Sequence, residues 1–283
     1  MSIKAENLTY TYMKGTPFEA TAIEDVSFEI DDGEFVAIIG HTGSGKSTLI
    51  QMLNGLLKPT SGRVLVDGVA FGESKKDLKE VRGKVGIVFQ YPEYQLFEET
   101  VAKDVAFGPR NQGVDEAEIE KRVKNAIEDM GLDYDEIKDM SPFELSGGQK
   151  RRVAIAGVLA MKPQIIVFDE PTAGLDPKGR ELLFARIEKL KTKGKTVILV
   201  SHSMDDVARL ADRIFVMYNG KLAATGTPKE IFCEECKNYG LYLPQITELV
   251  TKLNGTGKFN IDTGVFNVED VVDEIIKEMN GNA

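Results

Sequence analysis

The sequence lacks any apolar run long enough to cross a membrane. Its longest runs, such as Phe35–Ile39 and Ile165–Phe168, hold about five residues, whereas a spanning helix needs roughly 20. The first residues, Met1–Glu6, also lack the apolar core of a secretion signal. We therefore expect any role at a membrane to depend on a partner protein.

Cysteine and histidine are also scarce. The chain has 283 residues but only two of each, and the two cysteines, Cys233 and Cys236, have a C-x-x-C spacing. A zinc site needs four ligands, and both histidines lie in other motifs. A redox pair would be expected in a thioredoxin-like context, which the sequence does not have. We interpret the two cysteines as reduced thiols, one helical turn apart, in a cytosolic protein.

Positive charge is in the minority, since the formal net charge is −10 and the pI is about 5.0. Nucleic acid and anionic lipid repel such a chain unless it carries a local basic patch. The obvious basic cluster, Lys150–Arg152, begins a helix, and we interpret it as a local feature. We therefore expect no nucleic-acid partner, whereas a basic protein partner would suit the acidic balance.

The order of the expected elements divides the chain into parts. Residues 1–40 have the β-branched and aromatic residues of strands, with Asp31–Gly33 as a hairpin turn signal. Residues from about 91 to 160 have helical periodicity and form a helical subdomain. From Ile165 onwards strands and helices alternate, which favours a parallel sheet covered on both faces. Asn219–Gly220 is a further, strong hairpin signal.

The residues after Pro228 change character again. Gln245–Leu253 and Val268–Met279 are expected to be amphipathic helices, joined by a loose glycine-containing segment. We therefore expect a main domain of residues 1–228 and a helical C-terminal appendage of residues 229–283.

The most informative motif is a glycine-rich loop between an expected strand and an expected helix. Gly40-x4-Gly45-Lys46-Ser47 is a full P-loop pattern, in which backbone N–H groups and a helix N-terminus bind phosphate. Lys46 should reach the β- and γ-phosphates of a nucleotide, and Ser47 should bind Mg²⁺ through its hydroxyl. The expected nucleotide contacts are Gly40, His41, Thr42, Gly43, Ser44, Gly45, Lys46, Ser47 and Thr48.

Two acids follow the apolar strand that begins at Ile165. Asp169 stands at its end, where a carboxylate faces the ligand crevice of an open α/β sheet and can hold Mg²⁺ through water. Glu170 can orient or deprotonate an attacking water. An isolated Asp-Glu pair is often only a solvated loop, but together with the P-loop it predicts a magnesium-nucleotide site.

A second glycine-rich turn, Leu145–Gln149, precedes an expected helix over Lys150–Ala160. Ser146, Gly147 and Gly148 at a helix N-terminus could bind an anion, although Ser146 could also be only the helix cap. In a head-to-tail dimer this turn of one subunit can close over the γ-phosphate that the other subunit holds.

Together these segments resemble the nucleotide-binding subunit of ATP-binding-cassette (ABC) transporters, over residues 1 to about 230. The resemblance implies an α/β P-loop NTPase fold with an antiparallel β subdomain, a helical subdomain and a small helical appendage. It also implies that Ser146–Gln149 act on the partner's ATP, that Asp176 in Gly174–Pro177 lies at the dimer interface, and that His202 contacts the γ-phosphate. Gln90 would touch Mg²⁺ and the water, and Tyr12, with Tyr10 as the alternative, would stack on adenine.

Gln90–Val101, His41–Gly45 and Phe107–Pro109 are similar to ATPase subunits of energy-coupling-factor (ECF) transporters, in the form of the second of two paralogues. This resemblance implies a peripheral subunit at the cytoplasmic face of the cell membrane that drives import of a vitamin or a transition-metal ion. Its partners would be a second ATPase subunit (paralogue or self), an integral membrane scaffold and a substrate-capturing membrane subunit. The appendage would help hold the ATPases together. A scaffold helix carrying arginines would dock after Gln90, with Glu93, Glu98 and Glu99 as acceptors unless they are merely solvated.

Other functions remain as alternatives. A conventional ABC importer or an exporter subunit would carry the same motifs. Soluble ABC ATPases of DNA repair or chromosome maintenance insert long coiled coils, which the spacing from Gln90 to Leu145 leaves no room for, and those of translation carry two cassettes. A degenerate regulatory subunit is disfavoured because Glu170 and His202 are both intact.

Overall fold

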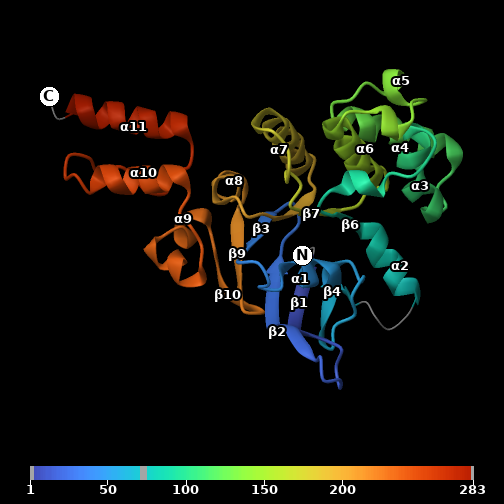
Figure 1. Cartoon of the computed structure of the whole chain (residues 1–283), viewed down its shortest axis with the longest axis horizontal. Coiled ribbons are helices and arrows are strands. Elements are labelled where there is room, and N and C mark those ends of the chain that lie inside the picture. The colour runs from blue at the N-terminus through green and yellow to red at the C-terminus, as the bar shows by residue number, and fades with distance from the viewer. Residues whose placement is uncertain (1–2, 71–74, 282–283) are drawn as a thin grey trace.

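The computed structural model describes residues 3–70 and 75–281, so the first two and last two residues of the expected domains lie outside it. Its strands form two sheets (Figure 1). The antiparallel sheet has the order β2-β1-β4-β5 and consists of β1 (Ile3–Tyr12), β2 (Ala20–Ile30), β4 (Ser61–Val66) and β5 (Val69–Ala70). The second sheet has the order β10-β9-β3-β8-β7-β6 and consists of β3 (Phe35–Ile39), β6 (Val85–Val88), β7 (Ile165–Asp169), β8 (Thr196–Val200), β9 (Arg213–Tyr218) and β10 (Lys221–Gly226).

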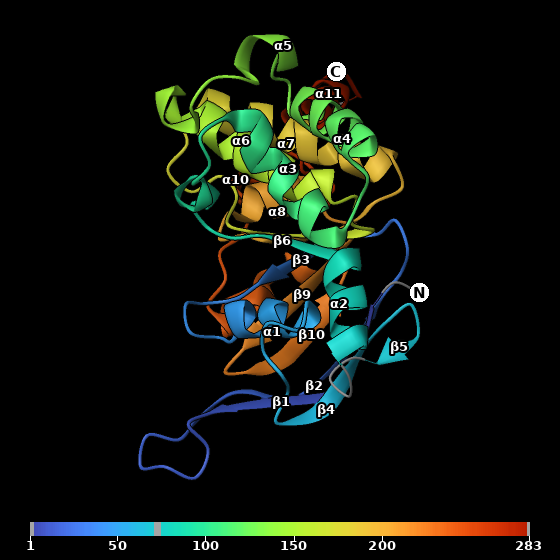
Figure 2. The same ribbon diagram turned by 90° about the vertical axis from the view of Figure 1, so that its right-hand side faces the viewer.

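The second sheet is parallel except at β10, and its central strands are buried on both faces. That burial explains why β3, β7 and β8 have nearly continuous apolar sequences instead of alternating ones. On one face, α1 (Lys46–Leu53) lies between the two sheets (Figure 2). Its buried side chains, such as Leu49 and Ile50, share one apolar cluster with both sheets.

Helices cover the other face of the parallel sheet. These are α6 (Gly147–Ala160), α7 (Pro177–Thr192) and α8 (Met204–Leu210), which belong to a second large apolar cluster. Beside α6 lie α3 (Val101–Gln112), α4 (Glu116–Asp129) and the short α5 (Tyr134–Ile137), in the region where the sequence predicts helices. The remaining elements before β7 are α2 (Lys75–Lys84), η1 (Pro92–Gln95) and η2 (Pro142–Glu144).

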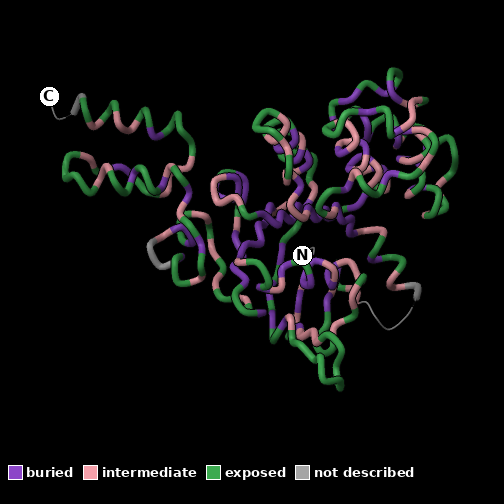
Figure 3. Tube along the Cα trace, in the orientation of Figure 1, coloured by how far each residue is buried: buried purple, intermediate pink, exposed green. Residues whose placement is uncertain are grey.

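The C-terminal segment comprises α9 (Pro228–Ile231), η3 (Glu234–Tyr239), α10 (Gln245–Asn254) and α11 (Val268–Gly281). Phe232 and Cys236 are buried in the main cluster, so the segment is anchored at its start. The helices α10 and α11 lie side by side around a small core of their own that includes Val250 and Val271 (Figure 1). Figure 3 shows that much of this helix pair is exposed.

Of the two hairpin expectations, one is confirmed and one is wrong. β9 and β10 pair antiparallel across Asn219 and Gly220, whose φ values of 49° and 77° are those of a type I′ turn. Asp31–Gly33 does reverse the chain, but β2 and β3 belong to different sheets. A turn signal indicates a change of direction only; β3 is buried on both faces and takes parallel partners on each side instead.

Among the described residues, no helix combines the length and the apolar character that crossing a bilayer requires. No disulfide joins Cys233 and Cys236 in this part of the chain.

Candidate active site

The P-loop connects β3 to α1, and two of its glycines are required by close approach of the chain to itself. Gly40 has φ 146°, and a Cβ there would lie 2.1 Å from the carbonyl oxygen of Met217. Gly45 has φ 102°, and a Cβ there would lie 2.6 Å from the carbonyl oxygen of Ala22. Any side chain at either position would clash with backbone, so the shape of the loop depends on glycine.

Lys46, in the first turn of α1, is buried, with 7% of its surface exposed. Its Nζ donates to the carbonyl oxygens of Gly40 at 2.7 Å and of His41 at 3.0 Å, so the ammonium is held inside the curl of the loop. Burial lowers the pKa of Lys46 below its ordinary value, and the carboxylates of Glu170 and Asp169 oppose this. The loop therefore concentrates positive charge and N–H donors where a polyphosphate would bind.

Tyr12, at the end of β1, lies next to the P-loop helix. Its hydroxyl is 3.1 Å from Thr48 Oγ1, and its ring is partly exposed. The ring of Tyr10 packs edge-on against it, with centroids 4.7 Å apart, and belongs to the apolar cluster between the sheets. Of the two tyrosines, Tyr12 is thus the more exposed, and it lies beside the loop.

The two acids lie at the same edge of the sheet as the P-loop, because β3 and β7 flank β8 in a parallel arrangement. Burial raises the pKa of Asp169, and Lys46 opposes the rise. Burial also raises the pKa of Glu170, to about 7; Asp169 adds to the rise and Lys46 opposes it. A carboxyl with a pKa near neutrality is suited to accept a proton from water.

Two further predicted residues lie at this edge. His202 follows β8, and its Nε2 is 3.4 Å from Glu170 Oε1, an oxygen that is buried without a hydrogen bond. Burial, with a contribution from Lys46, lowers the pKa of His202 below its ordinary value. Gln90 follows β6, the strand next to β7, and is exposed.

The donor set at this edge fits magnesium. The Ser47 hydroxyl and the Asp169 carboxylate supply hard oxygen atoms, and the raised pKa of Asp169 marks a buried anion that a cation would stabilise. Among the described residues, no three His, Cys, Asp or Glu side chains cluster as a metal site. In nucleotide sites, Mg²⁺ is usually bound through one or two carboxylates and the phosphates of the substrate.

The second glycine-rich turn begins α6 and differs from the P-loop in how its shape is held. Ser146 caps the helix reciprocally with Gln149: Ser146 Oγ accepts from the Gln149 backbone N–H at 3.4 Å, and Gln149 Oε1 accepts from the Ser146 N–H at 3.0 Å. A Cβ at Gly147 or Gly148 would meet nothing within 4 Å. Glycine costs about 1 kcal/mol relative to alanine in a helix. The packing of the chain itself therefore does not require glycine at either position.

A hollow of about 500 Å³ lies beside this turn, lined by Ser146, Gly148 and the segment Gly174–Asp176 with the start of α7. Asp176 caps α7 by accepting from the Gly179 N–H at 2.6 Å. No P-loop residue lines the hollow. The structure therefore brings the P-loop, Asp169, Glu170 and His202 together, but holds Ser146–Gln149 and Asp176 together at another place.

Arg151 is a residue whose importance the sequence analysis missed. It is 3% exposed, and its guanidinium donates to Glu93 from Nε at 2.9 Å and from Nη2 at 2.7 Å. Its Nη1 donates to the carbonyl oxygens of Pro171 and Ala173. Arg151 thus ties the start of α6 to the segment after Gln90 and to the segment after Glu170. A charged residue on the buried face of a helix was the signal that could have found it.

This contact corrects the expectation that Glu93 accepts from a partner's arginine, because both of its carboxylate oxygens accept from Arg151 of the same chain. Burial alone would raise the pKa of Glu93, but the hydrogen bonds from Arg151 hold it below its ordinary value. Glu99, in contrast, is exposed and accepts only a surface bond from Lys103 at 2.5 Å.

Comparisons with known proteins agree with this arrangement. Residues 23–173 match the ABC transporter family model. The energy-coupling factor transporter ATP-binding protein EcfA2 of Clostridium tetani is 56% identical over 100% of this chain and 99% of that protein. Its namesake from Clostridium acetobutylicum is 57% identical over 98% of each.

Solved structures confirm the fold. The structure of cbiO1 from Clostridium perfringens, described as part of the ABC transporter complex cbiONQ, has a TM-score of 0.75 at 42% identity, covering 88% of this chain and 98% of that one. A dimeric, post-hydrolysis state of the cassette MJ0796 bound to ADP and Pi has a TM-score of 0.71 at 34% identity, covering 80% and 98%. The chain therefore belongs to the ABC transporter family, among the ATP-binding proteins of energy-coupling factor transporters, and is an ATPase.

Proposed function

We propose that this chain is one of two ATPase subunits that drive import of a micronutrient, a vitamin or a transition-metal ion, at the cytoplasmic face of a cell membrane. The observation that carries the proposal is the separation of two half-sites. The P-loop half-site (Gly40–Thr48, Asp169, Glu170 and His202) would bind ATP. The signature half-site (Ser146–Gln149 and Asp176) has two glycines that face open space beside a hollow, which leaves room for a group from a partner. A second subunit would supply the complementary half of each site.

In the closed pair, the P-loop N–H groups and Lys46 would hold the phosphates of ATP, and Tyr12 would stack on the base. Ser47, Asp169 and Gln90 would hold Mg²⁺, which when bound neutralises charge on the β- and γ-phosphates. Glu170, with its raised pKa, would accept the proton of the attacking water. His202 would donate a hydrogen bond to the γ-phosphate. ATP would favour the closed pair and ADP the open one, and this differential affinity would make the cycle mechanical.

A groove of about 800 Å³ is the proposed dock for the membrane scaffold. It lies between α2, the segment after Gln90, α3 and α6. Its floor includes Phe97 and Phe107, which are 58% and 45% exposed and pack edge-on with centroids 5.0 Å apart. An apolar groove with charged residues on its rim suits an amphipathic helix. Because Glu93 is already paired with Arg151, the scaffold's arginines would pair with Glu98 and Glu99 instead.

The C-terminal appendage, residues 229–283 beside a main domain of residues 1–228, is proposed to hold the two ATPase subunits together. Its two long helices expose large apolar side chains, namely Leu249, Val268, Val272, Ile276 and Met279, with 46–63% of each exposed. An exposed apolar face of this kind marks an interaction site. The partner would be a paralogue or a second copy of this chain.

Isolation of the tagged chain from its own membranes in mild detergent, followed by mass spectrometry, tests the proposal. We expect a second ATPase subunit, a multi-spanning scaffold and small substrate-capturing membrane proteins, whose identity would name the cargo. Recovery of DNA- or ribosome-bound proteins instead would contradict the import function while leaving the ATPase chemistry intact.

A further inference from the structure

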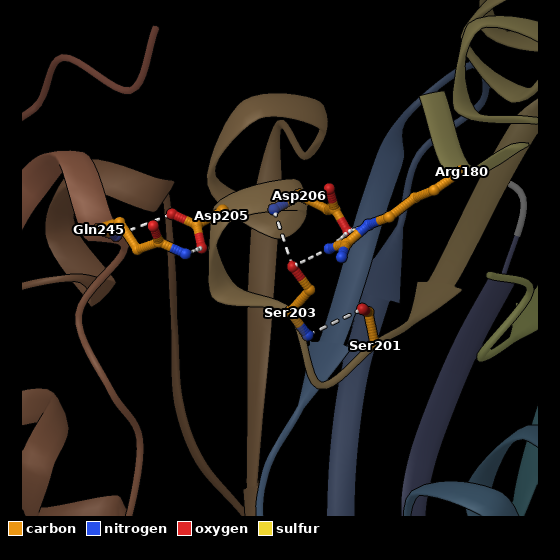
Figure 4. A network of polar contacts seen from close by, with 6 residues as sticks. All are labelled: Arg180, Ser201, Ser203, Asp205, Asp206 and Gln245. Atoms are coloured by element: carbon orange, nitrogen blue, oxygen red, sulfur yellow. Dashed lines mark hydrogen bonds and ion pairs between the residues drawn. The ribbon is translucent and has the colours of Figure 1, made fainter. Parts of the chain in front are cut away.

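Two neighbouring acids in α8 bind two different elements of the molecule (Figure 4). Asp206 is buried and accepts from Nε and Nη2 of Arg180, on α7; the same Nη2 donates to Ser203 Oγ. Asp205 points the other way and accepts from Gln245, through the backbone N–H at 2.7 Å and Nε2 at 3.3 Å. The short helix α8 is therefore held on one side by α7 and on the other by α10 of the C-terminal appendage.

Asp205 supplies the side-chain acceptor that the N-terminus of α10 lacks. The N-cap residue of α10 is Pro244, which has no side-chain acceptor, and no side-chain cap is formed from within the helix. The first N–H groups of a helix need acceptors, and negative charge near them is stabilising. The Asp205 carboxylate provides both to Gln245, the first residue of α10, although it lies 40 positions earlier in the sequence. The appendage helix is thus capped by the body of the ATPase.

The residues that lead into α8 include His202, the histidine of the candidate active site. Ser203 caps α8, and its N–H donates to Oγ of the buried Ser201 at 3.0 Å. His202 lies between these two serines, and 54% of its side chain is exposed. The position of the ring therefore depends on the backbone of Ser201–Ser203, together with the contact of Nε2 with Glu170 Oε1 at 3.4 Å. That backbone is in turn fixed by where α8 begins.

We propose that the Asp205–Gln245 contact is a link through which the C-terminal appendage positions His202 for hydrolysis. Asp205 and Gln245 are positioning residues, since neither touches the nucleotide. The inference rests on the role given to His202 under the proposed function and deepens it. The appendage then does more than join subunits: its docking on α8 is needed for the imidazole to meet the γ-phosphate.

The variants Asp205→Ala and Gln245→Pro break the link from its two sides. Gln245→Pro removes both donors, yet proline suits this position, because it is the first residue of a helix and Pro244 has φ −54° and ψ 146°, the extended conformation that precedes proline. Gln245→Ala removes only the longer bond. The matched control is Lys229→Met, which deletes the 2.8 Å ion pair to Asp262 within the appendage and leaves the Asp205–Gln245 contact in place.

The first readout is NMR of the histidine rings in the full chain. With only two histidines, His202→Gln assigns both ring signals. We expect Asp205→Ala and Gln245→Pro to shift the His202 signal and leave that of His41 in place. In the assembled ATPase, kcat should fall by up to about 10²-fold at unchanged KM for ATP, the size of effect that a small misplacement of a catalytic group can cause. Gln245→Ala should change both readouts less, and Lys229→Met neither.

Unchanged His202 signals and unchanged kcat in both link variants would overturn the inference. So would an equal effect of Lys229→Met, which would mean that general loosening of the appendage is responsible. The variant His202→Gln distinguishes failure of this inference from failure of the proposed function. If His202→Gln hydrolyses ATP normally, the role given to His202 itself is wrong. If it is inactive while the link variants behave as the unaltered chain, only the link is wrong.

Discussion

The two glycine-rich turns of this ATPase have opposite physical explanations. At the P-loop, a Cβ on Gly40 or Gly45 would strike backbone within the same chain. At the signature turn, a Cβ on Gly147 or Gly148 would meet open space. The first pair of glycines is required by the packing of the chain itself, and the second is not; we propose that the second pair leaves room for a group from a partner subunit. The comparison separates a loop whose shape depends on contacts within the chain from a turn whose glycines face open space.

The largest expected effect concerns the chemistry at the P-loop half-site. Glu170→Gln should lower kcat for ATP hydrolysis by about 10²- to 10⁴-fold, because the raised pKa that suits Glu170 as a proton acceptor is lost with the carboxyl group. ATP affinity should be retained. Steady-state turnover and nucleotide titration measure the two quantities, with the exposed Glu188→Gln on α7 as the control. Near-normal turnover would refute the general-base role.

Binding at the same half-site depends on Lys46. Lys46→Ala should weaken ATP binding about 10- to 100-fold, since charge-assisted hydrogen bonds contribute roughly 1.5–3 kcal/mol each. Titration of the isolated chain with a fluorescent ATP analogue would measure the change. An affinity equal to that of the unaltered chain would mean that the loop does not hold the phosphates.

Arg151, near the start of α6, connects the helix of the signature turn to the segment that follows Glu170. Arg151→Met should destabilise the fold by about 3 kcal/mol, because it leaves the partly buried Glu93 without its partner. Chemical denaturation would measure this. Since Arg151 depresses the pKa of Glu93, the stabilisation is present above the ordinary value of 4.5 and is lost as the pH falls through the depressed value. A denaturation midpoint for Arg151→Met that matches the unaltered chain at pH 7 would contradict the account.

A pair of alanine substitutions sharpens the comparison itself. Gly45→Ala should destabilise the chain, because the new Cβ would lie 2.6 Å from the carbonyl oxygen of Ala22 at a φ of 102°. Gly148→Ala should instead leave the stability of the isolated chain unchanged or raise it by less than about 1 kcal/mol, the Ala–Gly difference in a helix interior, because Gly148 lies in the first turn of α6. Thermal unfolding of both variants gives the answer. Equal destabilisation would show that the signature glycines serve the fold of the chain after all.

Local patterns predicted much of this molecule. The P-loop, the acids after β7 and the Asn219–Gly220 turn are each specified by neighbouring residues, so the sequence was sufficient to place them. Contacts between distant segments were not predictable in this way. Nothing near Arg151 indicates that its partner is Glu93, and nothing near Pro244 indicates that Asp205 caps the following helix. The wrong prediction of a hairpin between β2 and β3 has the same origin, because strand partners depend on burial over the whole sheet.

The most direct test of two half-sites is a single variant, Gly148→Asp, measured in two states. In the isolated chain at low concentration, ATP affinity should equal that of the unaltered chain, because the P-loop half-site is untouched. In the complex isolated from its membrane, ATP turnover should be lost, because a carboxylate would meet the γ-phosphate held by the other subunit. Retained turnover, or an ATP affinity reduced as much as by Lys46→Ala, would contradict the account.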